Sequence, residues 1–486
     1  MGTRRSALGG IGCGRLTICT LPLTIVLVCK RILYKNDHFT SGNNLLLAYL
    51  VMALRPFSKR ALVTLPDKDA LVQEYVGQRL SDLPTPSLVV DRSIVAQNCA
   101  IMHQTAKDWD ANFRAHVKTH KTAEGVVHQL KSSAGTTHAV IVSTIMEAWH
   151  IVNAGLVADG TVQDILYGVP VPMNKIADLA ELAHTMASHQ GVVRLIVDNP
   201  IQIQGLEEFG ARTGSHNWSV FIKVDAGNGR AGQVPNTPAM TALLQAALLS
   251  PAVSIYGFYC HAGNSYASKS AGEGSSFLTE EVNAVNTVAQ EAAQLASKLG
   301  GSHGVESWTL SVGSTPTMHA AASDAVRDQL RNVLVGKLEL HAGNYPFNDL
   351  QQLATNMISE HQIAPFVLSQ VIAYYPGRAK DGGDEAMCDV GGIGMSRDTG
   401  PRPGYGDLLW DGPGKGWRLV KISQEHGTLQ RKPDTPTSQL QIGDYIKICC
   451  QHACLTAAAY PFYFVVDSAG GKPDEVVDVW VSWKGW

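Results

Sequence analysis

Basic and imidazole side chains alternate along one short segment, Arg114-Ala115-His116-Val117-Lys118-Thr119-His120-Lys121. If this segment is a β-strand, Arg114, His116, Lys118 and His120 lie on one face, because successive side chains point to opposite sides. A solvated edge strand would be the ordinary interpretation of such a run. The alternative is chemical, since an amine among other cations loses its proton more readily and then attacks a carbonyl carbon. Lys118 is therefore a candidate imine-forming lysine.

A second candidate for chemistry lies near the other end of the chain, in Gln451-His452-Ala453-Cys454. On an extended segment, His452 and Cys454 would present an imidazole and a thiolate to the same side. Two ligands do not make a structural zinc site, but a catalytic zinc leaves positions open for water and substrate oxygens. The pair is therefore half of a candidate zinc site. Cys449 and Cys450 precede it and are predicted to be buried strand residues.

Short apolar runs rich in β-branched residues alternate with helical patterns through the centre of the chain. Nearly continuous apolar strands that alternate with helices indicate a parallel sheet covered on both faces. Eight such units in about 230 residues predict a (β/α)8 barrel of the α/β class rather than an open sheet. A barrel has no free edge, which weakens the edge-strand interpretation of the basic segment. The predicted strands begin near residues 113, 138, 164, 192, 219, 253, 308 and 332.

The pattern changes after Tyr345. Strand-like segments there alternate with turn-rich joins such as DGGD and TGPRPGYG, and few long helical patterns remain. The sequence therefore predicts a barrel over residues 61–346 and a C-terminal β domain over 347–486, against which 61–91 are a candidate to pack. The predicted C-terminal strands cover residues 366–374, 386–390, 416–422, 444–450 and 463–467.

The first 60 residues are treated as an N-terminal extension outside this fold. Residues 16–28 form an apolar run between basic residues, but the run is short for a transmembrane helix and Pro22 interrupts it. It resembles the core of a signal peptide, although no small-x-small cleavage site follows it cleanly. A signal or anchor, a targeting extension, and residues that the mature protein does not carry remain open, and the last two are favoured.

Composition limits the class of protein. Hydrophobic residues make up 45% of the chain and charged residues 17%, as in ordinary globular proteins. A net charge of −3 argues against a nucleic-acid or acidic-membrane partner, since both favour a concentrated basic surface. The nine cysteines show no CxxC pair or disulfide framework, which fits a reducing compartment and a cytoplasmic location.

The segment RAHVKTHKT resembles the cofactor-lysine motif of the D-serine dehydratase/D-threonine aldolase family, whose barrel enzymes are related to alanine racemase. The resemblance extends from about Ala61 to the end of the chain. It implies a barrel that binds pyridoxal 5'-phosphate (PLP), with the cofactor carried by Lys118. Lys121, the second lysine of KTHK, is expected to be a surface residue.

Further segments that resemble this family follow in order. FYCHAGNSY implies that His261 backs the cofactor ring and that Tyr266 contacts the cofactor, at the end of a barrel strand where barrel active sites collect. Gly313, Ser314 and Thr315 resemble the phosphate loop, because glycine allows close backbone approach while hydroxyls and a helix N-terminus supply donors. Taken alone, the first pair would be ordinary loop residues and the second group a helix cap.

Two more segments carry the resemblance less completely. Gly343-Asn344-Tyr345 is similar to the PGNY stretch of the family, whose tyrosine lies near the phosphate, but His341-Ala342 stands where Arg-Pro or His-Pro is usual. The group opposite the pyridine nitrogen therefore stays open. KVDxGxxR implies that Arg230 lies near the phenolic oxygen of the cofactor, and the alternative is a structural pair with Asp225.

The context QHACLTA resembles the D-serine dehydratase branch, and this implies that His452 and Cys454 bind Zn²⁺. The expected activity is PLP- and zinc-dependent dehydration of a small D-amino acid, D-serine, to pyruvate and ammonia by a homodimer. One alternative is a D-threonine aldolase, which would release glycine and an aldehyde. The other is a PLP-binding protein without catalysis, against which the metal pair and the large C-terminal domain argue.

Overall fold

The computed structural model describes residues 64–486, except 215–216, 301–307, 323–325 and 434–437. The chain divides into two units, Met1–Arg55 and Pro56–Trp486. The apolar run at 16–28 and the other expectations for residues 1–60 lie outside the described residues. Among the residues that the structure does describe, no helix combines the length and apolar character needed to cross a bilayer.

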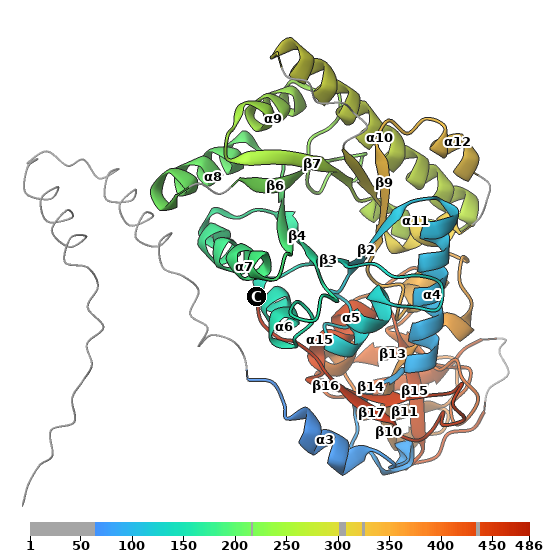
Figure 1. The fold of residues 1–486 in the computed structure, drawn as a ribbon. Coiled ribbons are helices and arrows are strands. Elements are labelled where there is room, and N and C mark those ends of the chain that lie inside the picture. The colour runs from blue at the N-terminus through green and yellow to red at the C-terminus, as the bar shows by residue number, and fades with distance from the viewer. Residues whose placement is uncertain (1–63, 215–216, 301–307, 323–325, 434–437) are drawn as a thin grey trace, which may run out of the picture. The chain divides into compact units, whose positions relative to one another are not determined.

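Eight parallel strands close into a barrel (Figure 1). Each strand pairs with its sequence neighbours, and the last pairs with the first, so that Arg114 lies opposite His341. The predicted (β/α)8 fold class is confirmed, although the last strand begins at Lys337 rather than near residue 332. The strands are β2 (Asn112–His116), β3 (Ala139–Val142), β4 (Asp164–Pro170), β5 (Val192–Val197), β6 (Trp218–Val224), β7 (Val253–Cys260), β8 (Thr309–Val312) and β9 (Lys337–Ala342).

Helices follow the strands and cover the outside of the barrel (Figure 1). Several begin where a side chain accepts a hydrogen bond from the first turn, as Thr122, Thr144 and Ser314 do. These caps lie soon after a strand ends, so local sequence determines where the chain turns back. The helices are α4 (Arg92–Asp108), α5 (Ala123–Leu130), α6 (Ile145–Asn153), α7 (Ile176–Ser188), α8 (Pro200–Thr213), α9 (Pro238–Leu249), α10 (Ala271–Lys298), α11 (Thr315–Ala321) and α12 (Arg327–Arg331).

The basic segment is not one continuous strand, which corrects the expected alternation. β2 ends at His116, and residues 117–120 form a turn before α5. Lys118 therefore projects from a loop at the carboxyl end of the barrel. His120 is fully buried, with its Nε2 2.8 Å from Oε1 of Gln129 on α5. The strand is too short for the four side chains to share one face.

Arg114, the first of the four, occupies the barrel interior. Its side chain is 1% exposed and pairs with Asp164 of β4 at 2.7 Å and with Glu339 of β9 at 2.9 Å. Arg194 of β5 lies 2.7 Å from the second oxygen of Asp164. Two guanidinium groups and two carboxylates thus satisfy one another inside the barrel, as buried charges must.

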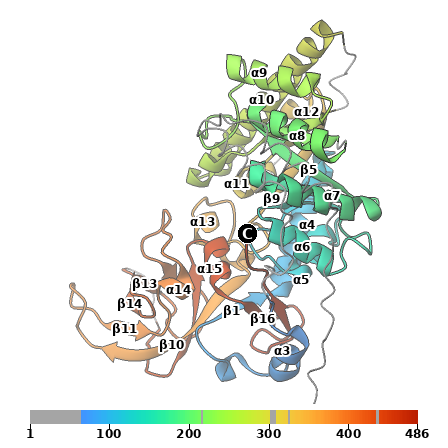
Figure 2. The same ribbon diagram turned by 90° about the vertical axis from the view of Figure 1, so that its left-hand side faces the viewer.

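The C-terminal part forms a nine-stranded sheet in the order β11-β14-β13-β12-β15-β10-β1-β16-β17 (Figure 2). β1 (Ser87–Asp91), which precedes the barrel in sequence, pairs antiparallel with β10 and parallel with β16. The other strands are β10 (Pro365–Tyr375), β11 (Glu385–Cys388), β12 (Gly406–Asp407), β13 (Trp417–Ile422), β14 (Gly427–Arg431), β15 (Tyr445–Cys450), β16 (Phe462–Val466) and β17 (Asp478–Val481).

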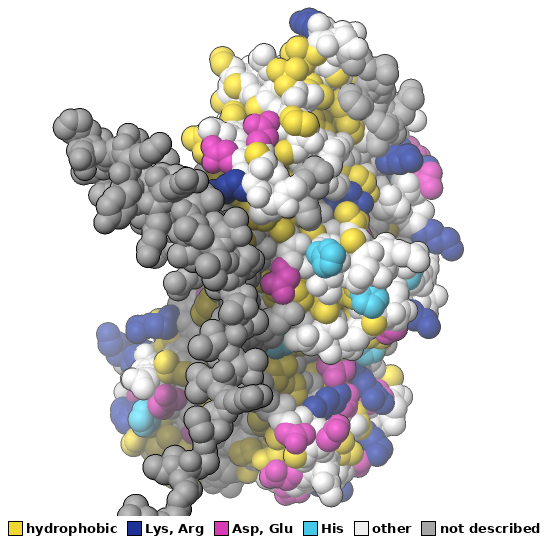
Figure 3. Space-filling model, turned by 60° about the vertical axis from the view of Figure 1, so that its left-hand side comes forward, with side chains coloured by type: hydrophobic (Ala, Val, Ile, Leu, Met, Phe, Trp, Pro, Cys, Tyr) yellow, Lys and Arg dark blue, Asp and Glu magenta, His cyan; other side chains and the backbone are white. Residues whose placement is uncertain are grey.

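Short helices accompany this sheet. α15 (Ala453–Ala459) follows β15 directly, and α14 (Gly392–Met395) packs against α15. α3 (Lys68–Tyr75) packs on β17, and α13 (Leu350–Leu353) follows the barrel. Acidic and basic side chains are interspersed over the face drawn in Figure 3, in keeping with the small net charge.

Candidate functional site

A cavity of about 420 Å³ opens at the carboxyl ends of the barrel strands. This is the end of a (β/α)8 barrel where active sites form. Of the predicted site residues, Lys118, Arg230 and His261 line it. The remaining lining residues are His116, Ser143, Gly168, Val169, Pro170, Lys223, Ala231 and Tyr259, so the described lining contains three lysine or arginine side chains and no carboxylate.

Lys118 reaches the cavity from the turn after β2. A Cβ atom at Gly343 would lie 3.1 Å from Cε of Lys118, so the missing side chain there leaves the lysine its room. The backbone amide of Lys118 donates to Nδ1 of His116 at 3.4 Å. Burial, reinforced by the charge of Lys118, holds the pKa of His116 well below its usual range. The imidazole beside the amine is therefore neutral at physiological pH.

His261 follows β7 and is held by the loop after β8. Its Nδ1 lies 2.7 Å from the carbonyl oxygen of Gly313. A carbonyl only accepts, so Nδ1 carries the proton and Nε2 of the neutral ring is unprotonated. Burial and the charge of Lys118 hold the pKa of His261 well below its usual range. His261 thus offers the cavity a flat, neutral ring in one tautomer.

The predicted phosphate loop forms a compact cluster of hydroxyl groups. Oγ of Ser314 accepts from the amide of Thr317 at 3.2 Å and lies 2.7 Å from Oγ of Ser265. Oγ1 of Thr315 accepts from the amide of Asn344 at 3.0 Å. Tyr266 hydrogen-bonds to Thr315, and burial raises the pKa of its phenol. The structure thus brings Tyr266, Ser314 and Thr315 together.

Gly313 is a position of this loop where only glycine fits. Its φ is +145°, and a Cβ atom would lie 2.1 Å from the carbonyl oxygen of His341. Gly313→Ala should therefore lower the free energy of unfolding by about 1–3 kcal/mol and displace the loop. Thermal unfolding measures the loss, with Gly300→Ala, where no atom lies within 4 Å, as a control for positive φ alone. Equal effects of the two substitutions would contradict this account.

Glu281 of α10 ties the loops after β7 and β8 together, and no sequence motif indicated it. Its Oε1 accepts from the amides of Ala262 at 2.6 Å and Gly313 at 3.3 Å. The side chain is fully buried, and burial raises its pKa to about 7. Because the partners are backbone amides, only the fold reveals this role.

The raised pKa of Glu281 predicts a pH effect on stability. The ordinary pKa of a glutamate is 4.5, and that of Glu281 in the folded protein is about 7. Between these two pH values the folded protein keeps a proton that the unfolded chain releases. Stability from this group is therefore present below pH 4.5 and falls as pH rises to 7. Glu281 should make the free energy of unfolding fall by up to about 1.4 kcal/mol per pH unit in that window, and Glu281→Gln should remove this fall. Exposed Glu280→Gln is the control, and identical slopes would refute the assignment.

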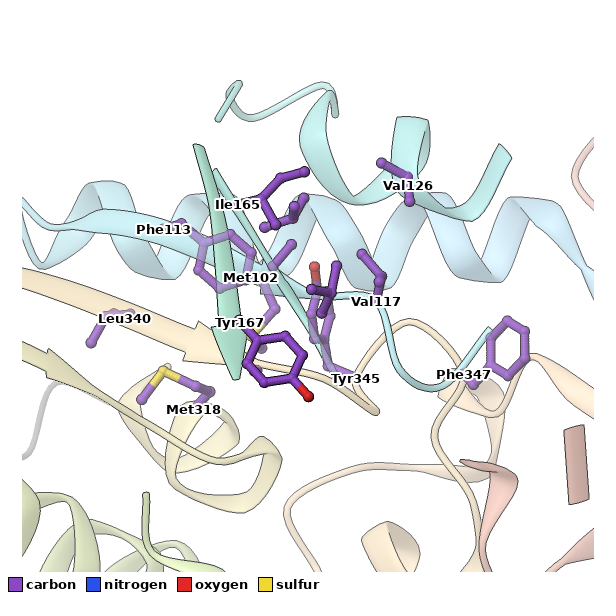
Figure 4. Packing of buried hydrophobic residues seen from close by; sticks show 14 of the residues in the cluster. Met102, Phe113, Val117, Val126, Ile165, Tyr167, Met318, Leu340, Tyr345 and Phe347 are labelled. Atoms are coloured by element: carbon purple, nitrogen blue, oxygen red, sulfur yellow. The ribbon is translucent and has the colours of Figure 1, made fainter. Parts of the chain in front are cut away.

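The structure does not bring Tyr345 to the cavity. Its ring is fully buried and packs edge-on against Phe113, with centroids 5.7 Å apart. Figure 4 shows it within the buried cluster that includes Met102 and Val117. Its hydroxyl is directed toward Cys99 and Gln129. Tyr345 therefore packs in the barrel core, and its expected phosphate contact stays a prediction.

Arg230 and Lys223 supply the other positive charges of the cavity. Arg230 is exposed at the rim, and Asp225 accepts instead from the amides of Gly227, Asn228 and Gly229. The alternative Asp225–Arg230 pair is therefore not formed among the described residues. Lys223 is buried at the end of β6, and burial, with Arg230 nearby, lowers its pKa. Lys223 is the first residue of the KVDxGxxR segment, but the motif by itself indicated no role for it.

His341 ends a buried chain of hydrogen bonds beneath the cavity. Glu339 accepts from the hydroxyl of Ser311 at 2.8 Å, so Ser311 uses its one proton there. The hydroxyl oxygen of Ser311 then accepts from Nδ1 of His341 at 3.0 Å. The ring of His341 stacks on Tyr259, with centroids 4.2 Å apart, and burial holds its pKa well below the usual range.

His452 and Cys454 lie at the start of α15, not on an extended segment. His452 is the N-cap residue and Cys454 is in the first turn, yet their side chains still hydrogen-bond. Burial alone would raise the pKa of the Cys454 thiol, but His452, with Lys118 also nearby, lowers it. Cys449 and Cys450 are buried in β15, as predicted.

In the part of the chain that the structure describes, the His452–Cys454 pair has no third protein ligand. Within the described residues, no group of three or more His, Cys, Asp or Glu side chains could hold a metal ion. Oδ2 of Asp398 lies 2.7 Å from Nδ1 of His452, which leaves the other ring nitrogen for Cys454 and a metal. Asp398 was missed because it lies 54 positions from His452.

Asp398→Ala should weaken zinc binding about 10- to 100-fold, because a carboxylate on the far nitrogen orients a histidine ligand and strengthens it. Competition with a chromogenic chelator measures this affinity. Asp411→Ala removes a carboxylate that is 93% exposed and serves as control. Unchanged affinity in Asp398→Ala would show that His452 needs no such support.

Two family models match the chain. "Putative serine dehydratase domain" matches residues 364–466, and "Alanine racemase, N-terminal domain" matches residues 90–331. The D-serine dehydratase of Schizosaccharomyces pombe is 39% identical over 436 residues, 88% of this chain and 98% of that protein. A D-threonine aldolase of Arthrobacter sp. is more distant, at 25% identity over 84% of this chain and 95% of that protein.

Solved structures show the same relationship. D-threo-3-hydroxyaspartate dehydratase from Delftia sp. HT23 has a TM-score of 0.68 at 27% identity, covering 84% of this chain and all of that one. A variant of D-threo-3-hydroxyaspartate dehydratase was solved in a metal-free form. With the 39% identity to the fission yeast enzyme extending over nearly its whole length, the chain belongs to the D-serine dehydratase family.

Proposed function

We propose that this chain is a D-serine ammonia-lyase that converts D-serine to pyruvate and ammonia. Its proposed cofactors are PLP, carried by Lys118, and a zinc ion held by His452 and Cys454. Family membership supports the activity, and the arrangement of the site supports the cofactors.

One contact carries the proposal. Oγ1 of Thr119 lies 3.0 Å from Sγ of Cys454. Thr119 directly follows Lys118, so the proposed cofactor lysine and the proposed metal ligand meet at one site. Dehydration of serine breaks a bond at Cα and a bond at Cβ of a three-carbon molecule. A lysine and a metal ligand on neighbouring segments of one site can act on both carbons.

The cavity suits PLP in charge and in shape. A phosphate and a substrate carboxylate are both anionic, and the described lining offers Lys118, Lys223 and Arg230 without a carboxylate. The close approach of Gly313 to the β9 backbone leaves the loop without a side chain at that point. Neutral His261 presents a ring face that can stack on a pyridine ring. These features fit the cofactor.

The chemistry of His452 and Cys454 suits zinc. The lowered pKa of Cys454 favours the thiolate, which is the form that binds metal. Asp398 leaves one nitrogen of His452 available. Water and the substrate hydroxyl would complete the coordination of a catalytic ion.

When bound, PLP would act as an electron sink for the reaction at Cα and zinc as a Lewis acid for the departing hydroxyl group. Lys118 is the amine of this chain suited to accept the α-proton, because it reaches the cavity from a turn beside two neutral imidazoles. Lys223 and Arg230 provide positive charge for the substrate carboxylate. Elimination releases one water, and hydrolysis to pyruvate and ammonia uses one, so the conversion is balanced.

The test follows pyruvate formation by the purified full-length chain. D-serine and L-serine are supplied after incubation with PLP, with and without a zinc chelator. Pyruvate from D-serine alone, lost with chelator and restored by zinc, would support the proposal. Glycine and acetaldehyde from D-threonine, without pyruvate, would favour the aldolase. Absence of any cofactor absorption band would refute the assignment of Lys118.

The assembly is a separate part of the proposal. We infer a homodimer from the family resemblance, and a cytoplasmic location from the cysteine pattern. Light scattering of the purified chain measures its mass against the 52.2 kDa of one copy. A monomer mass with full activity would exclude a catalytic role for dimerisation.

A further inference from the structure

The second lysine of KTHK has an unexpected environment. Lys121 was predicted to be a surface residue, but its side chain is 27% exposed and lies 3.1 Å from Oε1 of Glu147. Its φ is +50°, a left-handed conformation that a residue with a Cβ atom adopts at a cost. Such a conformation persists only where surrounding contacts hold it. Lys121 therefore lies in a turn held by its neighbours.

Glu147 connects that turn to the next barrel loop. Its carboxylate is 1% exposed, and Oε2 accepts from the backbone amide of Ser143 at 2.7 Å. Ser143 follows β3 and lines the cavity beside Lys118. The ion pair thus joins the loop after β2, which carries Lys118, to the loop after β3. A buried carboxylate with these two partners is costly to leave unpaired.

Residues of β16 and of the segment after β17 hold the same turn through its backbone carbonyl groups. The backbone amide of Trp483 donates to the carbonyl oxygen of Lys121 at 2.7 Å. The indole of Trp483 is 4% exposed and stacks on His150 of α6, with ring planes 12° apart. The hydroxyl of Tyr463 on β16 donates to the carbonyl oxygen of His120 at 2.9 Å. Two successive carbonyl groups of the turn are therefore held by the C-terminal part of the chain.

We propose that Lys121, Glu147 and Trp483 form a clamp that positions Lys118 for bonding to its cofactor. The clamp deepens the proposed function and rests on it, since Lys118 is the proposed cofactor lysine. All three are positioning residues, because they act through the backbone of residues 117–122. The clamp explains why the second lysine of the motif is placed three residues after the first. It also gives the segment after β17 a role at the active site.

The test compares full-length variants. Lys121→Met removes the ion pair, and Trp483→Ala removes the stack on His150. Lys121→Arg and Trp483→Phe are the conservative counterparts, and Trp486→Ala, at a side chain 84% exposed, is the control. Three properties are measured: hydrogen exchange of the peptide covering 117–122, the dissociation constant for PLP, and kcat and KM for D-serine.

Lys121→Met and Trp483→Ala should speed exchange in residues 117–122 and weaken PLP binding on the order of tenfold or more. The value of kcat should fall more than KM rises, because the misplaced group is the reacting amine. Lys121→Arg and Trp483→Phe should recover most of the loss, and Trp486→Ala should match the wild type. If Trp483→Ala does not fold, Lys121→Met still decides the matter, since its side chain is partly exposed.

The outcomes separate the clamp from the proposed function. Wild-type exchange and PLP affinity in both variants would overturn the clamp while leaving Lys118 as cofactor lysine. If the wild-type chain binds no PLP but both variants still show faster exchange in residues 117–122, the clamp on the turn is supported and the proposed function is rejected.

Discussion

Replacing Lys118 with alanine should lower pyruvate formation from D-serine by at least about 10³-fold. The side chain is the one amine that projects from the turn after β2 into the cavity, where it would both hold the cofactor and accept the α-proton. Loss of a group with two roles removes both contributions together. Steady-state assays of pyruvate, with excess PLP in solution, measure the effect. The near-visible absorption of enzyme-bound PLP should disappear in the same variant.

Lys223→Ala is the matched control for this experiment. Lys223 lines the same cavity, but its amine donates to the carbonyl oxygen of Val224 at 3.0 Å. We expect this variant to keep the absorption band and to change KM more than kcat, since the proposal gives Lys223 a part in binding the substrate carboxylate and not in carrying the cofactor. If Lys118→Ala kept the band and Lys223→Ala lost it, the cofactor lysine would have been misassigned.

Replacing Cys454 with alanine should abolish dehydration while PLP binding remains. A thiolate ligand is half of the protein's contribution to the proposed zinc ion, and no third protein ligand is present among the described residues. Lewis-acid assistance supplies several kcal/mol, so the rate should fall by roughly 10²- to 10³-fold or more. Bound zinc, measured by elemental analysis, should fall in parallel. The absorption band should be retained.

Cys450→Ala is the control, because Cys450 is buried in β15 four positions earlier, where burial raises the pKa of its thiol. It should keep its zinc and most of its activity. Full dehydratase activity in Cys454→Ala would reject a role for zinc in removing the hydroxyl group. Loss of zinc without loss of activity would lead to the same conclusion.

The barrel could be predicted from sequence because its signals are local. The apolar runs at 164–170, 192–197 and 218–224 are typical of buried parallel strands. Capping side chains such as Thr122 and Thr144 mark where helices begin. The C-terminal sheet was harder. Longer strands such as β10 and β16 were predicted from their apolar residues, but two-residue β12 has no periodicity to detect. The partners of β1 come from residues hundreds of positions away.

The candidate site likewise contains residues that local motifs indicate and residues whose roles depend on tertiary contacts. Lys118, His261 and the Gly313 loop could be proposed from the sequence because each follows a barrel strand within a recognisable motif. Glu281, Lys223 and Asp398 were not found, because their roles depend on backbone amides, on burial and on one distant imidazole. Tyr345 matched a motif, but its position after β9 turns the ring into the core. A motif specifies a residue type and an order, whereas a side chain's direction depends on packing.

The sequence by itself therefore determined the barrel, the lysine that reaches its carboxyl end and the histidine–cysteine pair, since all three depend on patterns within a few residues. Only the tertiary structure decided that the two groups meet. Thr119 and Cys454 are 335 positions apart, and their 3.0 Å contact exists because α15 packs over the turn after β2. No local pattern encodes such a meeting, because it results from the burial of many side chains along the whole chain between them.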